Sequence, residues 1–149
     1  MLFVLAGIYA APAQAYQERT AVKTASVCAG VLESLMLVVV LTIPADTPEE
    51  TRNEVVDFYS SQFDAVASFV EAHQAAAGVA NTEIGTLIDR GRAYLQAIYE
   101  SVTPPPLEAI ATASQPCNDL AAALRMKASA SIDAAFAAAT VHHRPLLTD

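Results

Sequence analysis

The feature that most constrains the fold is the apolar stretch over residues 20–43, TAVKTASVCAGVLESLMLVVVLTI, in which Glu33 is the only acid. At 100° per residue around a helix, one narrow stripe collects Arg19, Lys23, Ser26, Gly30 and Glu33. The next two positions on this stripe are Leu37 and Leu41, so a helix over about 17–43 begins amphipathic and ends apolar on every side. We therefore expect Glu33 to stay out of the core, and the apolar end to be buried in a protein core or in a bilayer.

The second helix has a clear start and a clear end in the sequence. The run Thr47-Pro48-Glu49-Glu50 predicts a helix start, with Thr47 as the N-cap residue and Glu50 reaching back to it in a capping box. We expect this helix over 48–77, because Gly78 is suited to the left-handed position that follows a helix.

Two more helices follow. The third is expected over 82–102 with Asn81 as its N-cap residue, and Gly91 on its apolar face would let a neighbouring helix approach closely. The fourth is expected as one nearly continuous helix over about 106–140. Its apolar positions keep a single three-four rhythm through Pro116, although a start near residue 115 is the alternative.

The composition agrees with closely packed helices. Hydrophobic residues make up 54% of the chain, many of them alanine, and there are only 5 glycines. Four helices with short connections predict an all-α fold, specifically an antiparallel up-down-up-down four-helix bundle. We expect a single domain over 16–141, followed by a flexible tail over 142–149.

The first fifteen residues, MLFVLAGIYAAPAQA, combine an apolar run with the A-x-A sequence Ala13-Gln14-Ala15. This signal-like pattern is typical of a secretory signal peptide, here one that is cut before Tyr16. We therefore expect an exported protein in a periplasmic, luminal or extracellular compartment. The alternative is that residues 1–15 are retained, either as a helix that packs on the body or as a membrane anchor.

The predicted bundle makes the first and fourth helices antiparallel neighbours, which tests whether the two cysteines meet. Cys28 lies 15 residues before residue 43, roughly 22 Å along the helix, and Cys117 lies 11 residues after residue 106, roughly 16 Å. A modest stagger closes this gap, whereas a fourth helix that began at residue 115 would leave about 20 Å between them. We therefore expect a Cys28–Cys117 disulfide, with two buried free thiols as the alternative.

Motifs for catalysis and for metal binding are absent from the sequence. There is no H-E-x-x-H, no Glu-x-x-His, no C-x-x-C and no G-x-S-x-G. His73 lies on the apolar face of the second helix, where we expect a hydrogen-bonded interfacial histidine, and His142 and His143 lie in the predicted tail. We therefore expect no catalytic residue, no metal ligand, no cofactor and a protein that is not an enzyme.

The charge of the chain excludes one class of partner. A net charge of −8 with 8 Lys and Arg residues leaves no basic surface for nucleic acid. The expected function is therefore contact with a protein partner that the sequence does not identify.

The first alternative is a subunit of a membrane-associated assembly, since residues 27–43 are barely long enough to span a bilayer. Placing Glu33 in the bilayer would cost roughly 2.5–3.5 kcal/mol. The second is a bundle that binds an apolar small ligand.

Overall fold

The computed structural model describes residues 4–104 and 106–148, with side chains from residue 18 onward, and it is helical without a strand over those residues. This confirms the predicted all-α fold. The six helices are α1 (Val4–Thr42), α2 (Glu49–Ala77), α3 (Asn81–Glu100), α4 (Leu107–Met126), α5 (Ser129–His142) and α6 (Arg144–Leu147).

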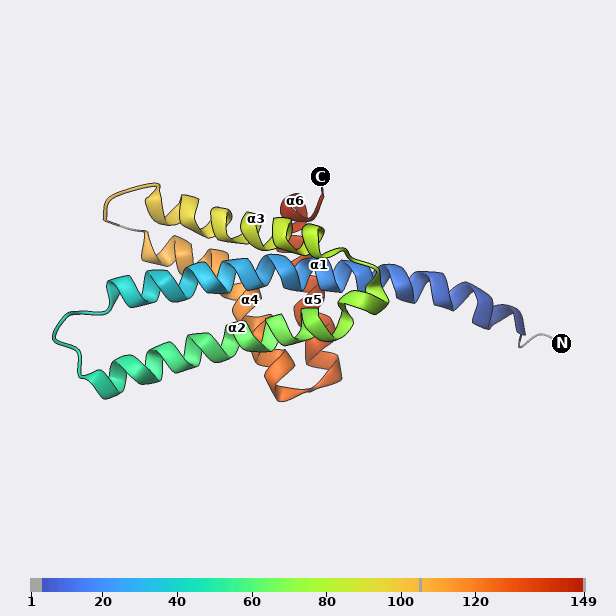
Figure 1. Cartoon of the computed structure of the whole chain (residues 1–149), viewed down its shortest axis with the longest axis horizontal. Coiled ribbons are helices and arrows are strands. Elements are labelled where there is room, and N and C mark those ends of the chain that lie inside the picture. The colour runs from blue at the N-terminus through green and yellow to red at the C-terminus, as the bar shows by residue number, and fades with distance from the viewer. Residues whose placement is uncertain (1–3, 105, 149) are drawn as a thin grey trace.

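The long helix α1 is the central element, because α2, α3, α4 and α5 all pack against it. Figure 1 shows α2 running back along α1, and α3 returning in the same direction as α1, with the first turns of α1 projecting beyond the body. The largest fully buried aliphatic side chains come from α1, α2, α3 and α4: Val22, Val27, Val31, Leu32, Val66, Leu87, Leu95 and Leu120. In a regular up-down-up-down bundle α1 and α3 would lie across a diagonal, so the close α1–α3 contact leaves that topology unconfirmed.

Two glycines explain why α1 and α3 approach so closely. A Cβ atom on Gly91 would lie 2.1 Å from the carbonyl oxygen of Val27, and a Cβ atom on Gly30 would lie 1.9 Å from that of Ile88. Any side chain at either position would therefore strike the backbone of the other helix. The close approach predicted for Gly91 is confirmed, and Gly30 is its counterpart on α1.

The polar stripe of α1 flanks this contact with α3. Arg19 and Lys23 both pair with Glu83, at 3.0 and 3.5 Å. Further along, Glu33 accepts a hydrogen bond from Arg92 Nε at 2.6 Å, and this bond and the nearby negative charge raise the pKa of Arg92. Glu33 lies outside the core, as its place on the stripe predicted, and it is half-buried and ion-paired with Arg92.

The ends of α2 match the prediction at one terminus and not at the other. Gly78 has φ 66°, and its N–H donates to the carbonyl of Ala75, so the predicted helix end is confirmed. The predicted capping box is wrong. Pro48 occupies the N-cap position with an extended backbone and no side-chain cap, which leaves Thr47 one residue too early to cap the helix.

The third helix begins one residue earlier than expected. Asn81 is its first helical residue, and Ala80 takes the N-cap position without a side-chain hydrogen bond. The side chain of Asn81 instead accepts a hydrogen bond from the Gln74 amide of α2. Asn81 therefore ties the end of α2 to the start of α3 and does not cap its own helix.

The fourth predicted helix is divided in two. α4 begins at Leu107 and contains Pro116 in its interior, as expected. The continuation to residue 140 was wrong, because Lys127 takes a left-handed conformation with φ 55° and ends α4. α5 then begins a new direction and packs on both α4 and α1.

Residues 142–148 are packed against the body, unlike the flexible tail that the sequence suggested for 142–149. His143 is 1% exposed, and Leu147 is buried in the turn of α6. Arg90 of α3 donates hydrogen bonds to the carbonyl oxygens of Leu146 and Thr148, at 3.2 and 3.1 Å. The buried side chains of His143 and Leu147 therefore hold this short segment against the body, although many of its residues are polar.

Of the predicted signal segment, the structure describes the backbone of residues 4–15, which is helical and continuous with the rest of α1. Residues 1–3 are not described, and neither are the side chains up to residue 17, so cleavage after Ala15 stays a prediction. Within the described side chains, the part of α1 from Glu18 to Thr42 is long and apolar enough to cross a membrane, but 67% of its most apolar window is buried inside the body.

Candidate functional site

The two cysteines that the sequence singled out are joined at the centre of the molecule. Cys28 of α1 and Cys117 of α4 form a disulfide with their Cα atoms 5.1 Å apart, and both are fully buried. This confirms the predicted Cys28–Cys117 bridge. The bond joins positions 89 residues apart in the sequence.

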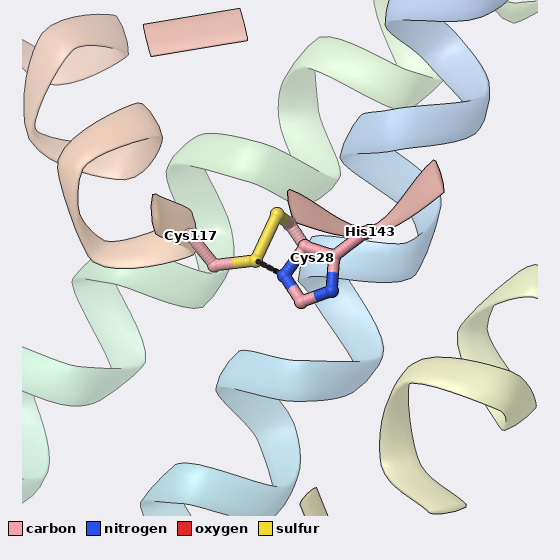
Figure 2. Close-up of side chains that lie close together, drawn as sticks. All are labelled: Cys28, Cys117 and His143. Carbon is pink, nitrogen blue, oxygen red and sulfur yellow. Dashed lines mark hydrogen bonds between the residues drawn. A yellow bond between two sulfur atoms is a disulfide. The ribbon is translucent and has the colours of Figure 1, made fainter. Parts of the chain in front are cut away.

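A histidine that we did not predict at this position lies directly against the disulfide. The Nε2 atom of His143 is 3.3 Å from the Cys117 sulfur (Figure 2). Nδ1 of the same ring has no hydrogen-bond partner among the described residues. Burial, with a smaller effect of the neighbouring His142, lowers the pKa of His143 to about 4. The ring is therefore neutral at physiological pH, next to two sulfur atoms.

Little in the local sequence indicates that His143 is buried. It follows another histidine and precedes Arg144 and Pro145, a polar composition that favours a loose terminus. The available signal was the Leu146-Leu147 pair, because Leu147 is buried and holds the turn in place.

Sulfur and nitrogen atoms of Cys28, Cys117 and His143 all lie within 4.8 Å of one another.

The second histidine of interest is His73 on α2. Its ring stacks on Phe69 with centroids 4.3 Å apart, and Nδ1 lies 3.5 Å from a carboxylate oxygen of Glu18 on α1. The predicted place of His73 at an interface between helices is therefore confirmed.

A surface of exposed apolar side chains lies at the end of the molecule where α1 stops. Leu37 is 57% exposed and Leu41 is 71% exposed, although the sequence led us to expect all-round burial there. Three more exposed apolar residues belong to the same end: Val40 of α1, Val102 after α3 and Leu107 at the start of α4. We call these five residues the apolar end. Figure 1 shows that the C-terminal end of α1, the end of α3 and the start of α4 all meet on this side.

The apolar end is bordered by acids, and a cleft reaches it at Leu107. A cleft of about 280 Å³ opens beside it between α1, α2 and α4, lined by Val38, Val39, Tyr59 and Leu107 among others. Exposed carboxylates surround this end of the molecule: Asp46, Glu49, Glu50, Glu54, Asp57, Glu100 and Glu108. The only Lys or Arg over 37–58 and 96–108 is Arg52, whose guanidinium donates to the carbonyl oxygens of Pro44, Ala45 and Thr47.

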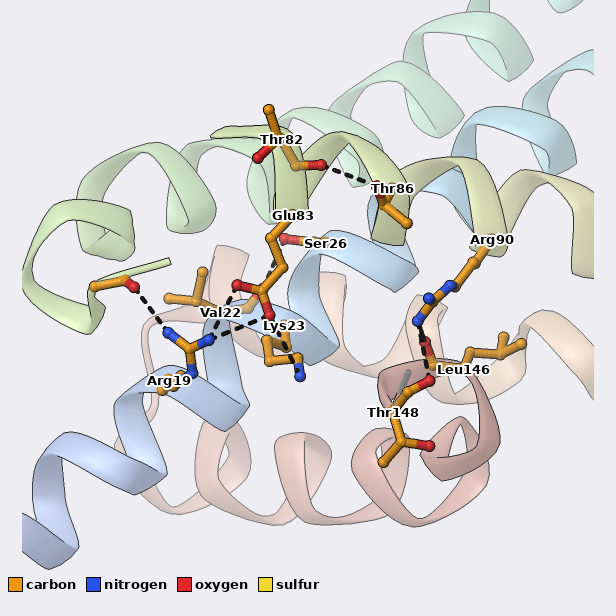
Figure 3. Close-up of polar contacts among 11 residues, drawn as sticks. Arg19, Val22, Lys23, Ser26, Thr82, Glu83, Thr86, Arg90, Leu146 and Thr148 are labelled. Carbon is orange, nitrogen blue, oxygen red and sulfur yellow. Dashed lines mark hydrogen bonds and ion pairs between the residues drawn. The ribbon is translucent and has the colours of Figure 1, made fainter. Parts of the chain in front are cut away.

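Three of the eight basic residues lie around a cleft at the other end of α3. This cleft of about 380 Å³ is lined by Arg19, Lys23, Arg90, Thr82, Thr86 and Glu83, with Leu87 and Leu147 at its floor. Figure 3 shows Glu83 between Arg19 and Lys23, while Arg90 points to the carbonyl oxygens of the C-terminal turn. Because these cations bind groups of the protein itself, their arrangement explains the packing of α1, α3 and α6.

A wider groove of about 670 Å³ lies between α3 and α4. It is lined by apolar residues such as Ile98, Leu107 and Ala113, with Tyr94 and His142 as its polar pair. The Tyr94 hydroxyl and His142 Nε2 are hydrogen-bonded at 3.2 Å, and burial raises the pKa of Tyr94. This groove reaches the apolar end through Leu107.

No protein-family model, curated protein sequence or solved structure matches this chain. Two regions of the molecule are candidates for a function: the buried Cys28–Cys117–His143 cluster and the apolar end.

Proposed function

We propose that this protein is an exported, non-enzymatic binding protein that docks a cationic amphipathic helix of a partner protein on its apolar end. The observation that carries the proposal is the exposure of Leu37 and Leu41 near the end of the long central helix α1. Burial of one leucine side chain is worth about 1.5–3 kcal/mol, so a partner that covers both gains substantial free energy. Exposed apolar side chains that gather at one end of a molecule and are bordered by polar groups are typical of interaction sites.

The charge around the apolar end selects the chemistry of the partner. Five carboxylates over 37–58 and two over 96–108 face a single arginine that is already bound to backbone carbonyls. Such a border attracts lysine and arginine side chains and repels the anionic head groups of a membrane surface. A helix with leucines on one face and lysines on the other matches both the apolar surface and its acidic border.

Two further observations support export and the absence of catalysis. A buried disulfide that joins α1 to α4 is typical of proteins in an oxidising compartment. The residues that border the apolar end are aliphatic side chains and exposed carboxylates, without a nucleophile paired to a base. Binding, and not group transfer, is the activity that this surface supports.

The experiment is a titration of the oxidised protein with a fluorescent peptide helix that carries leucine on one face and lysine on the other. We expect saturable binding that weakens as salt rises, because the acidic border contributes. The double substitution Leu37→Ser/Leu41→Ser should weaken binding at least about tenfold, since one lost leucine contact already exceeds the 1.4 kcal/mol that corresponds to tenfold.

The matched control is Val141→Ser on α5, which removes a side chain of similar exposure, 64%, away from the apolar end. This variant should bind the peptide like the original protein, and thermal unfolding should show that both variants fold. Equal affinity in Leu37→Ser/Leu41→Ser and the original protein would refute docking at the apolar end.

Membrane association is the second candidate function, favoured by the length and apolarity of α1 up to Thr42. Vesicles of phosphatidylcholine, with and without phosphatidylglycerol, distinguish it from the first. Sedimentation of the protein with vesicles in a manner that depends on Leu37 and Leu41 would favour a lipid surface over a protein helix. Its absence, together with peptide binding, would favour the protein partner.

A further inference from the structure

We propose that, when the disulfide is reduced, Cys28, Cys117 and His143 form a binding site for a thiophilic metal ion, with Zn²⁺ as the ion whose charge the site balances. The inference is independent of the proposed docking function. It concerns residues that the sequence assigned to a structural bridge and to a tail.

The geometry brings the right donor types together without help from any other residue. Nε2 of His143 is 3.3 Å from the Cys117 sulfur, and the three ligand-type atoms lie within 4.8 Å of one another. Around a tetrahedral zinc ion, with Zn–S near 2.3 Å and Zn–N near 2.0 Å, ligand atoms lie roughly 3.5–3.8 Å apart. Once the sulfur–sulfur bond is broken, rotation of the two cysteine side chains is enough to reach that spacing.

The donor set also has the right charge for a buried position. Two thiolates and one neutral imidazole carry a charge of −2, which one divalent cation neutralises. Thiolate and imidazole are ligands that Zn²⁺ prefers, whereas Ca²⁺ and Mg²⁺ prefer oxygen. Cys28 and Cys117 are 0% exposed and His143 is 1% exposed, so a bound ion would be screened from competing ligands in solution.

The oxidised structure leaves the imidazole poorly satisfied, which points to a missing partner. Nδ1 of His143 has no hydrogen-bond partner among the described residues, and Nε2 faces only sulfur. Sulfur is a weak hydrogen-bond acceptor, and a buried polar group without a good partner is costly. A metal ion bound to Nε2 would give this ring the strong interaction that the disulfide does not provide.

The oxidised protein is converted to the zinc-bound state by reduction of the disulfide and then binding of the ion. A dithiol reductant transfers two electrons and two protons to the protein, the Cys28–Cys117 bond breaks into two thiols, and the reductant closes to its own disulfide. Zn²⁺ then forms two Zn–S bonds and one Zn–N bond, and the two thiol protons leave to solvent. An open coordination position accepts water or another small ligand.

Entry of the ion requires the core to open, so binding is coupled to refolding. Cys28 lies on the central helix and His143 lies on the C-terminal segment that packs over the disulfide (Figure 2). Structural zinc ions commonly bind during folding and contribute their binding free energy to it. Metal loading should therefore be carried out by refolding the reduced chain in the presence of the ion.

The test uses the full chain, reduced with a phosphine in denaturant, then refolded without oxygen in the presence of one equivalent of Zn²⁺. We expect native mass spectrometry to show one zinc ion per chain, and we expect a higher melting temperature than in the reduced protein without metal. Co²⁺ in place of Zn²⁺ should give the absorption bands of a thiolate-bound ion. A parallel refolding with Cu⁺ shows whether a monovalent soft ion binds the same three ligands.

Adjacent histidines supply matched variants. His143→Gln should weaken zinc binding at least about tenfold and change the Co²⁺ spectrum, whereas His142→Gln, which alters an exposed ring, should change neither. Unfolding of both variants in their oxidised form shows that they fold. Absence of bound Zn²⁺ and Cu⁺, or equal binding in His143→Gln and His142→Gln, would overturn the proposal. Equal zinc binding by the oxidised protein would overturn it as well.

Discussion

The contact between α1 and α3 allows the sharpest stability prediction. Gly30 and Gly91 lie where the two helix backbones meet, so we consider Gly91→Ala and Gly30→Ala, each of which adds one methyl group. Gly85, the other glycine of α3, has nothing within 4 Å of the position of its missing Cβ atom and is exposed. Gly85→Ala is therefore the matched control within the same helix as Gly91.

The structure sets the size of the effect. A new Cβ atom on Gly91 would lie 2.1 Å from the Val27 carbonyl oxygen, and an ordinary contact is about 1.3 Å longer. The atom that it meets is helix backbone, which cannot rotate away as a side chain would, so the helices must separate. We expect a cost near the upper end of the usual 1–3 kcal/mol range for overpacking, about 3 kcal/mol. The better helix propensity of alanine offsets about 1 kcal/mol, which leaves a net loss of about 2 kcal/mol.

The assay is urea unfolding of the oxidised proteins, followed by circular dichroism. Gly91→Ala and Gly30→Ala should each lower the free energy of unfolding by about 2 kcal/mol or more, while Gly85→Ala should raise it by about 0.5–1 kcal/mol. If Gly91→Ala were as stable as Gly85→Ala, the two helices would not be in backbone contact, and the explanation of the α1–α3 packing would be wrong.

Three further predictions concern the disulfide, its histidine and the ion pair on α1. Cys28→Ala/Cys117→Ala should lower the free energy of unfolding by up to about 4.6 kcal/mol, measured in urea, and no change would contradict a bridge that closes this long loop. In the oxidised protein, His143 takes up a proton below pH 6.5 when the chain is unfolded, but only near pH 4 when it is folded. The free energy of unfolding should therefore be highest above pH 6.5 and fall by about 3 kcal/mol as the pH drops to 4. His143→Leu should remove that part of the pH dependence, and an identical dependence in both proteins would refute it. Glu33→Gln should cost no more than about 1 kcal/mol by thermal unfolding, because the pair with Arg92 is partly exposed, and a much larger loss would mean that Glu33 is a core residue.

The sequence predicted the features that depend on local periodicity and on strong helix signals. The rhythm of apolar residues gave the main helices, Gly78 gave the end of α2, and Gly91 gave a close approach. Counting residues from the helix ends brought Cys28 and Cys117 to similar heights, and the disulfide followed. The helix end and the close approach were predictable because they depend on helix geometry, whereas the disulfide also required the two helices to lie side by side.

Other features were decided by packing between distant segments. On a helical wheel, Glu33 and its basic neighbours look solvated, yet they border the contact with α3, because paired charges tolerate the edge of an interface. Lys127 breaks the last long helix without a glycine or proline to mark the place. His143 is buried through contacts with the disulfide, which no local pattern in the tail reveals.

The exposure of the apolar end could not be predicted for a related reason. Leu37 and Leu41 continue the stripe of α1 that lies beside α3, so we expected neighbouring elements to bury both side chains. α3 ends at Glu100, before it can extend past the end of α1, and the chain then turns toward α4. The last turn of α1 is therefore left without cover from α3, and Leu41 is 71% exposed there.

The Cys28–Cys117 bond also changes the molecule as a covalent object. It turns residues 28–117 into a ring that contains α2 and α3, with an arm on each side. A protease that cuts the connection between α1 and α2, or between α3 and α4, would leave a single molecule that separates into two pieces only after reduction. The C-terminal arm carries His143 over the bond, so a reductant reaches the sulfur atoms only while this arm is detached. The rate at which an excess of small thiol reduces the disulfide of the native protein therefore reports the rate at which that arm detaches.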